Sequence, residues 1–345
     1  MDTPADRIKS QEGDSTPVRL LFELSGEHPG LSLLELSSVV EALQGNVPSL
    51  TKETSIAIIE THLEPEGIGD RIALCHRVNE IVSSGSLESL LKVAKEMKIG
   101  GSVAVRCRKV LRSRKERCSE IEKQFGNIFA RSHSIDLVRP STLIRVILGR
   151  ENYLTIQRHE VDRKSYDRRK VALRPFFYPI SLHPKFARLL VNMTKVRKGE
   201  TLLDPFCGTG GILIEAGLVG AAPIGSDLRG DMVEGCRVNL KKFGVKADLF
   251  QADINDIDEH VNRVNAIATD PPYGRSTSTK GRDILGLYSK SFEVLSNVLE
   301  NGRNLAIIVP REDLIDSGKE YMELEASHSL RVHKSLTRHF CLFKN

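Results

Sequence analysis

The spacing of apolar positions divides the chain into an irregular first part and a regular second part. Strands mixed with helices over fewer than a hundred residues predict a small α+β region at 18–100, of ferredoxin-like type. In that region, short apolar runs predict strands at 18–24 and 55–60, and helically spaced apolar positions predict helices at 32–43 and 87–97.

A two-sided strand is predicted next, where apolar side chains alternate with Arg106 and Arg108. Such a strand has one apolar face and one basic face. The pattern then predicts a helix and a two-stranded hairpin, at about 116–131 for the helix and at 143–148 and 153–157 for the strands.

From Gly199 onward the pattern is a repeat of buried strands and helices, preceded by an amphipathic helix that begins near Pro184. Four successive predicted strands each end in an aspartate. Because parallel strands end at one edge of a sheet, these four side chains should share that edge. Each aspartate alone could instead cap the following helix. The four are Asp204, Asp227, Asp253 and Asp270.

The end of the chain predicts how this sheet is completed. A helix at 285–299 and a fifth strand at 304–310 continue the repeat. Apolar runs at 330–333 and 339–343 then predict an antiparallel hairpin. The predicted fold is therefore α/β, with a mostly parallel sheet that ends in an antiparallel hairpin.

Composition predicts a globular protein of a reducing compartment. Hydrophobic residues make up 40% of the chain and charged residues 28%. No apolar run approaches the roughly 20 residues of a membrane span, and residues 1–17 are polar, which predicts a disordered tail without a secretion signal. The six cysteines form no C-x-x-C pair, so no metal site is predicted and a cytoplasmic location is expected.

Positive charge is concentrated in residues 101–178, which hold 19 Lys+Arg against 8 Asp+Glu, while the whole chain carries only +5. A one-sided basic block predicts binding to a polyanion, although a solvated charged surface is the simpler alternative for any single run. Residues 161–178 are strongly basic and predict a linker that can follow a phosphate backbone. The candidate RNA-binding residues are Arg106, Arg108, Lys109, Arg112, Arg114, Lys115, Arg117, Arg163, Lys164, Arg168, Arg169 and Lys170.

A glycine-rich turn follows the strand that ends at Asp204. Glycines at 208, 210 and 211 let the backbone turn tightly and approach a ligand closely. A dinucleotide fingerprint would need a third glycine where Leu213 stands. An acid at Asp227, at the end of the next strand, can accept the hydroxyls of a ribose.

The sequence ATDPPYGRS at 268–276 predicts a rigid corner at the end of the fourth strand of the repeat. Pro271 and Pro272 fix their own φ angles and hold the preceding backbone extended. Asp270 and the carbonyl of Pro271 could then accept the two hydrogens of an amino group on an aromatic base, while Tyr273 stacks on the ring. The alternative is an ordinary strand-ending turn.

Three segments together resemble a known family: DPFCGTGG at 204–211, DPPYG at 270–274 and HKSLTRH at 333–339. The turn resembles that of S-adenosylmethionine-dependent methyltransferases, and the chain resembles archaeal tRNA guanosine-10 N2-methyltransferases. The resemblance implies a Rossmann-like class I methyltransferase domain at 179–345, preceded by an α+β region with a THUMP-like RNA-binding domain at about 101–160.

The resemblance also implies roles for the motif residues. S-adenosylmethionine is the expected cofactor and tRNA the expected partner, with a small activating subunit as a further possible partner. The expected catalytic residues are Asp270, Pro271, Pro272 and Tyr273. The expected cofactor-binding residues are Asp204, Pro205, Phe206, Cys207, Gly208, Thr209, Gly210, Gly211, Asp227, Leu228, Asp253 and Ile254.

Three alternatives stay open from the sequence. DPPY also serves DNA adenine methyltransferases and enzymes that methylate RNA guanine at other tRNA positions or in ribosomal RNA. The chain could also be a tRNA-binding subunit without activity. N2 of guanine needs acceptors near its developing positive charge and no covalent intermediate, so Cys207 is expected to fill space in the turn and not to act as a nucleophile.

Overall fold

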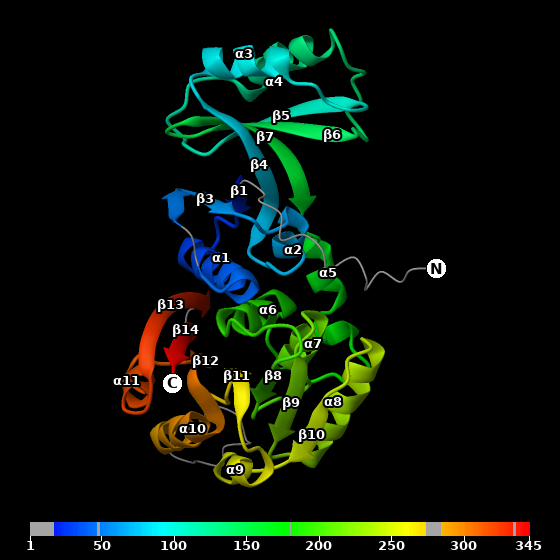
Figure 1. The fold of residues 1–345 in the computed structure, drawn as a ribbon. Coiled ribbons are helices and arrows are strands. Elements are labelled where there is room, and N and C mark those ends of the chain that lie inside the picture. The colour runs from blue at the N-terminus through cyan, green and yellow to red at the C-terminus, as the bar shows by residue number, and fades with distance from the viewer. Residues whose placement is uncertain (1–16, 47–48, 180, 274–283, 334–335) are drawn as a thin grey trace. The chain divides into compact units, whose positions relative to one another are not determined.

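The computed structural model describes residues 17–46, 49–179, 181–273, 284–333 and 336–345 (Figure 1). Its contacts divide the chain into two compact units. The first comprises Met1–Phe22, Pro48–Pro65 and Val78–Arg158, and the second comprises Glu23–Val47, Glu66–Arg77 and His159–Asn345. No helix among the described residues is both long and apolar enough to cross a membrane.

A seven-stranded sheet includes all the early strands, in the order β2-β3-β1-β4-β7-β6-β5. The strands β5 and β6 pair in parallel, and β6 and β7 are antiparallel. The bounds are β1 Val18–Leu24, β2 Leu50–Glu53, β3 Ile56–Thr61, β4 Cys75–Gly85, β5 Val103–Lys109, β6 Thr142–Leu148 and β7 Asn152–Glu160.

Two helices of the first unit, α3 (Leu87–Glu96) and α4 (Cys118–Phe129), cover one face of this sheet near β5 and β6 (Figure 1). Their apolar side chains, including Phe125 and Phe129, pack with Val103 and Val105 of β5 in one buried cluster. The prediction of an apolar face on β5 is therefore confirmed. The strands β2 and β4 were not predicted from the sequence. In β4, Asn79 is buried beside Val78, so apolar and polar side chains do not alternate along the strand.

The second unit contains the predicted parallel sheet, with strand order β10-β9-β8-β11-β12-β14-β13. From β10 to β12 the neighbours pair in parallel, and β14 is antiparallel to both β12 and β13. The bounds are β8 Thr201–Asp204, β9 Ala222–Asp227, β10 Asp248–Gln251, β11 Val264–Thr269, β12 Leu299–Val309, β13 Glu323–His333 and β14 Leu336–Lys344. The predicted Rossmann-like sheet with a terminal hairpin is confirmed.

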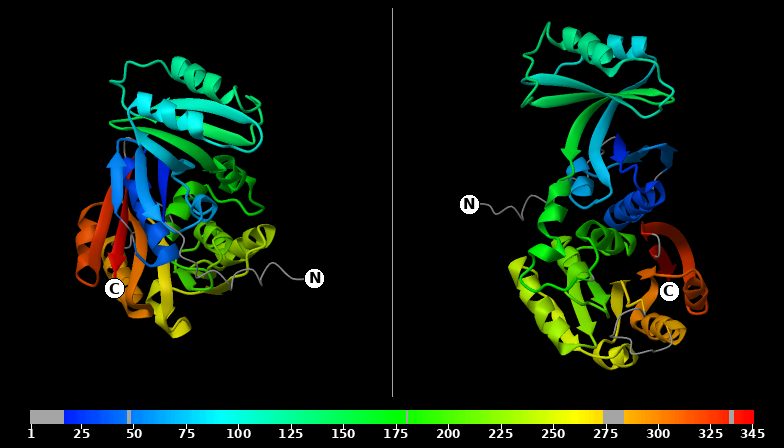
Figure 2. Two further views of the ribbon diagram at one scale, coloured as in Figure 1. Left: turned by 45° about the horizontal axis from the view of Figure 1, so that its top comes forward. Right: turned by 180° about the vertical axis from the view of Figure 1, so that it is seen from behind.

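Helices cover both faces of this sheet, which explains why its central strands, such as β11, are largely buried (Figures 1 and 2). Side chains of α10, such as Phe292, pack with Leu203 and Ile307 on one face. Side chains of α6 and α7 pack with Leu202 and Ala306 on the other. The helices of the second unit are α1 Pro29–Gln44, α5 Arg163–Arg168, α6 Pro184–Met193, α7 Gly211–Leu218, α8 Gly230–Lys242, α9 Ile257–His260, α10 Ile284–Val298 and α11 Asp313–Lys319, with 3-10 turns η2 Val171–Leu173 and η3 Ile254–Asp256; the short α2 Pro65–Gly69 begins at the last residue of the first unit.

The helix α1 belongs by its contacts to the second unit, so the division differs from the predicted boundary at residue 100. The buried Glu35 of α1 accepts hydrogen bonds from the backbone of Ala73 and Leu74 and from Asn192 of α6. These bonds connect segments far apart in the sequence. No local pattern could predict them, and the functional domain boundaries stay predictions.

The segment predicted as a basic linker, 161–178, is folded. It contains α5 and η2, and it buries Tyr166 and Arg174 within the second unit. Arg174 donates hydrogen bonds to the carbonyl of Arg169 and to Thr209 Oγ1. The high charge of the segment led to the prediction of a linker, because the sequence does not distinguish a buried arginine such as Arg174 from an exposed one.

Candidate active site

The four predicted aspartates follow the carboxyl ends of four neighbouring strands. Because β10, β9, β8 and β11 are adjacent and parallel, Asp253, Asp227, Asp204 and Asp270 follow one another along a single edge of the sheet. Ligands of open α/β sheets bind at this edge. The sequence prediction of a shared edge is confirmed.

The glycine turn between β8 and α7 is built from left-handed backbone. Gly210 has φ +80, and a Cβ there would lie 2.6 Å from the Sγ atom of Cys236. Gly208 has φ +49, yet a Cβ there would meet no other heavy atom closer than 4.0 Å. The turn is therefore packed tightly against α8 at Gly210 and open to a ligand at Gly208.

Further hydrogen bonds fix the turn to the strands and helices around it. The backbone N–H of Cys207 donates to the carbonyl of Ser226 over 2.8 Å, and Ser226 Oγ donates to the carbonyl of Pro205 over 3.3 Å. Asn239 of α8 donates to the carbonyl of Thr209 over 2.9 Å. Phe206 packs on the core and Gly211 begins α7. The eight predicted turn residues, 204–211, thus form one rigid structure.

Asp227 is oriented by two backbone N–H groups. Gly208 donates to its Oδ2 and Arg229 to its Oδ1, each over 3.0 Å. Every carboxylate oxygen retains a second lone pair. The side chain therefore presents two acceptors beside the glycine turn, which suits a pair of neighbouring hydroxyls.

Asp204 is fully buried beneath the same edge. Its Oδ1 accepts from Thr269 Oγ1 over 2.7 Å and from the N–H of Phe206 over 3.2 Å. Burial raises the pKa of Asp204 to about 7, and the nearby charges of Asp270 and Asp227 contribute to the rise. Asp204 is repelled by two neighbouring carboxyl groups, and this repulsion favours a positively charged ligand.

The side chain of Asp270 is held by a hydrogen-bonded chain. Tyr273 Oη donates to Asp270 Oδ1 over 2.5 Å, and Arg338 Nε of β14 donates to Tyr273 Oη over 3.0 Å. The carbonyl of Pro271 accepts from the buried Tyr288 Oη of α10 over 3.4 Å. Tyr273 was expected to stack on a base, and its hydroxyl also binds the carboxylate.

Three of the expected cofactor-binding residues, Leu228, Asp253 and Ile254, lie just beyond the ends of β9 and β10. Leu228 is 48% exposed, whereas Ile254 is buried. Asp253 caps η3, and its Oδ1 accepts from the backbone and the side chain of Asn255. Asp253 therefore caps the helical turn that follows it, which was the alternative considered for each aspartate. A role for Asp253 in cofactor binding stays a prediction.

Cys207 is buried beside Cys236. The hydrogen bond that the Cys207 thiol donates to Cys236, together with burial, raises the pKa of Cys207 well above its usual range. A thiol in this state is a poor nucleophile, which agrees with its expected role as a filler of the turn.

The candidate RNA-binding residues fall into two groups. Four have side chains engaged in their own unit: Arg106 and Arg114 donate to backbone carbonyls, Arg108 donates to Ser55 Oγ, and Arg169 pairs with the buried Glu215 at 2.7 Å. Eight are exposed, and three of these, Arg117, Arg168 and Lys170, form ion pairs at the surface. The eight are Lys109, Arg112, Lys115, Arg117, Arg163, Lys164, Arg168 and Lys170. The sequence could not separate these groups, because the partners of the first are distant along the chain.

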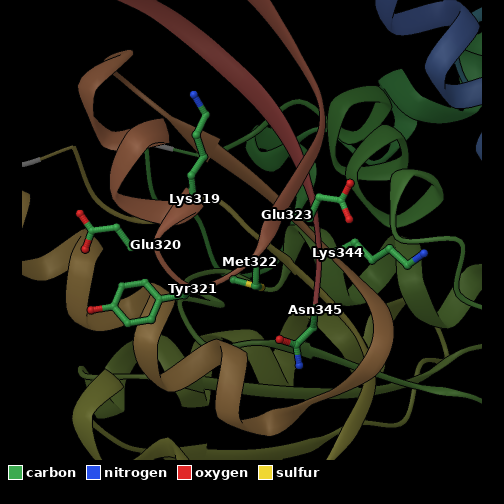
Figure 3. Close-up of a pocket in the computed structure, with 7 residues that line it drawn as sticks. All are labelled: Lys319, Glu320, Tyr321, Met322, Glu323, Lys344 and Asn345. Atoms are coloured by element: carbon green, nitrogen blue, oxygen red, sulfur yellow. The ribbon is translucent and has the colours of Figure 1, made fainter.

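No other place in the described residues gathers chemistry of this kind. They contain no group of three metal-ligating side chains. A hollow of about 390 Å³ is lined by the C-terminal residues 344–345 and by 319–323. Figure 3 shows its charged side chains, including Lys319, Glu320 and Lys344, extending in different directions, so they do not converge on a ligand.

Comparison with known proteins gives concordant matches. A family described as "RMKL-like, methyltransferase domain" matches residues 172–339. A tRNA (guanine(10)-N2)-dimethyltransferase of Methanothermobacter thermautotrophicus is 34% identical, over 93% of this chain and 98% of that protein. A protein of the same name from Pyrococcus abyssi is 35% identical, over 93% and 98%. The structure of TrmN from Thermus thermophilus has a TM-score of 0.58 at 22% identity, over 95% of this chain and 100% of that chain, and shows the same fold.

The parallel sheet, the glycine turn and the row of aspartates define a Rossmann-like, S-adenosylmethionine-dependent methyltransferase. The similarity to the two archaeal proteins extends over nearly the whole of each chain. The chain belongs to the tRNA (guanine(10)-N2)-dimethyltransferase family.

Proposed function

We propose that this protein transfers methyl groups to the exocyclic N2 amine of guanosine 10 in tRNA, adding two in succession. The observation that carries the proposal is the position of Asp270 at the end of β11, next to Asp204 and the glycine turn. The two relatives named for guanine-10 dimethylation support the choice of base and position.

The residues at the sheet edge fit S-adenosylmethionine. Asp227 offers two oriented acceptors to the ribose hydroxyls, and the open backbone at Gly208 leaves room for the methionine part. The repulsion of Asp204 by Asp227 and Asp270 is relieved by a ligand with ammonium and sulfonium charges. When bound, this cofactor supplies an electrophilic methyl group.

Asp270 acts on the amine of guanine. Its Oδ1 is held by Tyr273, and we assign Oδ2 as the acceptor for one amine hydrogen. The carbonyl of Pro271, which has a second lone pair beyond the bond from Tyr288, accepts the other. Both acceptors stabilise the positive charge that develops on nitrogen during transfer, and Asp270 then takes the released proton.

The first unit and the exposed cations bind the tRNA. Guanosine 10 must leave its stacked position to reach Asp270, and the face of the Tyr273 ring away from the Arg338 guanidinium is where its base stacks. The basic segment at 101–117, with its THUMP-like context, provides the shape and phosphate contacts that RNA recognition uses. Activity of the isolated chain tests whether any activating subunit is needed.

Cofactor affinity is expected to increase as the pH rises from about 6 to about 8. Binding of a cation favours ionised Asp204, whose pKa is raised to about 7 in the free protein, so binding releases a proton. Below that pKa, Kd should fall by up to ~10-fold per pH unit. Titration calorimetry across this range measures it. Asp204→Asn should flatten the dependence, and a flat profile in the unsubstituted protein would contradict the assignment.

Charge reversal in the basic segment is expected to weaken tRNA binding and reduce its salt dependence. Lys109, Arg112 and Lys115 are exposed, and removing one cation from a phosphate should lower the salt slope by about 1. The measurement is tRNA affinity of the triple glutamate variant at several salt concentrations. Lys52→Glu, exposed on β2, is the control. An unchanged slope would show that these side chains do not bind phosphate.

The function itself is tested by incubating the chain with an unmodified tRNA transcript and a labelled methyl donor. We expect N2-methylguanosine and then N2,N2-dimethylguanosine at position 10, located by mass spectrometry of nuclease fragments. A transcript with adenosine at position 10 is the matched control and should take up no label. Methylation of that control, or of another base, would reject the proposal.

A further inference from the structure

A side chain from the C-terminal hairpin reaches the predicted catalytic carboxylate. Arg338 lies on β14, which β12 separates from β11 in the sheet. Its Nε donates to Tyr273 Oη over 3.0 Å, and the guanidinium carbon lies 5.7 Å from the centre of the Tyr273 ring. Tyr273 Oη in turn donates to Asp270 Oδ1 over 2.5 Å. The three side chains form one continuous chain.

The direction of both hydrogen bonds is determined by chemistry. A guanidinium is always protonated and only donates. The oxygen of Tyr273 must therefore accept from Arg338, and its single hydrogen is left for Asp270. Because Arg338 fixes the tyrosine hydroxyl as a donor, one oxygen of Asp270 is anchored and the other has a defined orientation.

We propose that Arg338 is a positioning residue, which acts through Tyr273 to keep the Asp270 carboxylate ionised and aimed at the amine of guanine. This inference rests on the proposed function for its role in methyl transfer. Arg338 stands 65 residues from Tyr273 in the chain, and its role is distinct from binding either substrate.

The charges around Asp270 show why an arginine is needed there. None of the three neighbouring groups supplies a positive charge to Asp270, because Asp204 at the end of β8 is an acid and both Tyr288 of α10 and Tyr273 are neutral. Burial raises the pKa of Asp270, and the positive charge of Arg338 is the largest influence that lowers it. Without that charge the Asp270 carboxyl group would hold its proton up to a higher pH. A proton on Oδ2 would then weaken the hydrogen bond that this oxygen accepts from the amine.

The test compares Arg338→Met, which removes the charge, with Arg338→Lys, which keeps it, and with Tyr273→Phe, which removes the connection. In Arg338→Met we expect kcat on the acidic limb of the pH–rate profile to fall by up to ~10-fold, with recovery in alkaline buffer because that limb moves up by about one unit. Arg338→Lys should shift the limb less. Cofactor affinity and melting temperature should stay close to those of the unsubstituted protein.

Arg331→Met is the matched control, because Arg331 is an exposed arginine on the neighbouring strand β13. It should leave rate and pH profile unchanged. A uniform loss of rate in Arg338→Met at every pH, with an unmoved acidic limb, would show a merely structural role and overturn the inference.

A second readout does not depend on turnover. Carbon-13 NMR of protein labelled at the aspartate carboxyl carbons reports the titration of Asp270, identified by the resonance that disappears in Asp270→Asn. The titration midpoint should be higher in Arg338→Met than in the unsubstituted protein. Equal midpoints would refute the inference even if methylation is confirmed, and a shifted midpoint would support the charge role even if the methylated base is a different one.

Discussion

Replacing Asp270 by asparagine is expected to abolish most methyl transfer while leaving both ligands bound. The carboxylate is the acceptor nearest the developing charge, and asparagine keeps its shape but carries no negative charge. Removing one such electrostatic interaction typically lowers kcat by ~10²–10³-fold. The bond from Tyr273 Oη to Oδ1 can persist in the variant, so the corner should keep its geometry.

The measurement is kcat with saturating tRNA and labelled donor, together with Kd for each. Asp258→Asn is the control, since Asp258 is an exposed acid on α9. Cofactor and tRNA affinities should change by no more than a few-fold. Full activity of Asp270→Asn would remove Asp270 from the mechanism.

Replacing Gly210 by alanine is expected to eliminate detectable cofactor binding. The new Cβ would lie 2.6 Å from Cys236 Sγ, and the left-handed φ of +80 is itself unfavourable for alanine. The clash requires the Cys236 side chain to move or the turn and α8 to separate, and separation moves Gly208 and its bond to Asp227. The turn would then hold neither the ribose nor the methionine part of the cofactor.

A matched variant separates backbone strain from the clash. Gly244 also has a left-handed φ, +67, but a Cβ there would meet nothing within 4 Å. Gly244→Ala should lose only ~1–2 kcal/mol of stability and bind the cofactor normally. Calorimetry of the two variants makes the comparison, and equal affinity in both would mean that the turn does not hold the cofactor.

The parallel sheet and its edge could be predicted because their causes are local. A strand buried on both faces is a continuous apolar run, and an acid directly after it marks the carboxyl end. Four predicted strands that are each followed or ended by an aspartate, at Asp204, Asp227, Asp253 and Asp270, predict both the strand direction and the position of the site. The glycine pattern at 208–211 then separates the turn from a dinucleotide fingerprint.

The contacts that complete the site could not be predicted because they join distant parts of the chain. Arg338 lies in the HKSLTRH segment that carried the family resemblance, yet nothing in its neighbours indicates Tyr273 as its partner. Thr269 and Tyr288 similarly look like ordinary core residues. Only the order of β11, β12 and β14 brings the hairpin to the catalytic corner.

The basic block shows a different limit of the sequence. The charge count identified residues 101–178 as a basic segment, but it did not show which of its cations are already paired. Arg114 and Arg169 form ion pairs with Glu116 and Glu215. An arginine that pairs within the protein cannot be told from a phosphate-binding arginine by the residues next to it in the sequence. The exposed cations, such as Arg112 and Lys115, are therefore the better targets for substitution.

A crystal structure with S-adenosylhomocysteine, the demethylated cofactor, would show directly whether the cofactor binds between the glycine turn and Asp270. We expect ribose hydroxyls within hydrogen-bond distance of both Asp227 oxygens, and the sulfur atom in the space between Gly208 and the Asp270 carboxylate. A ligand bound elsewhere, or an Asp270 side chain directed away from the sulfur, would contradict it.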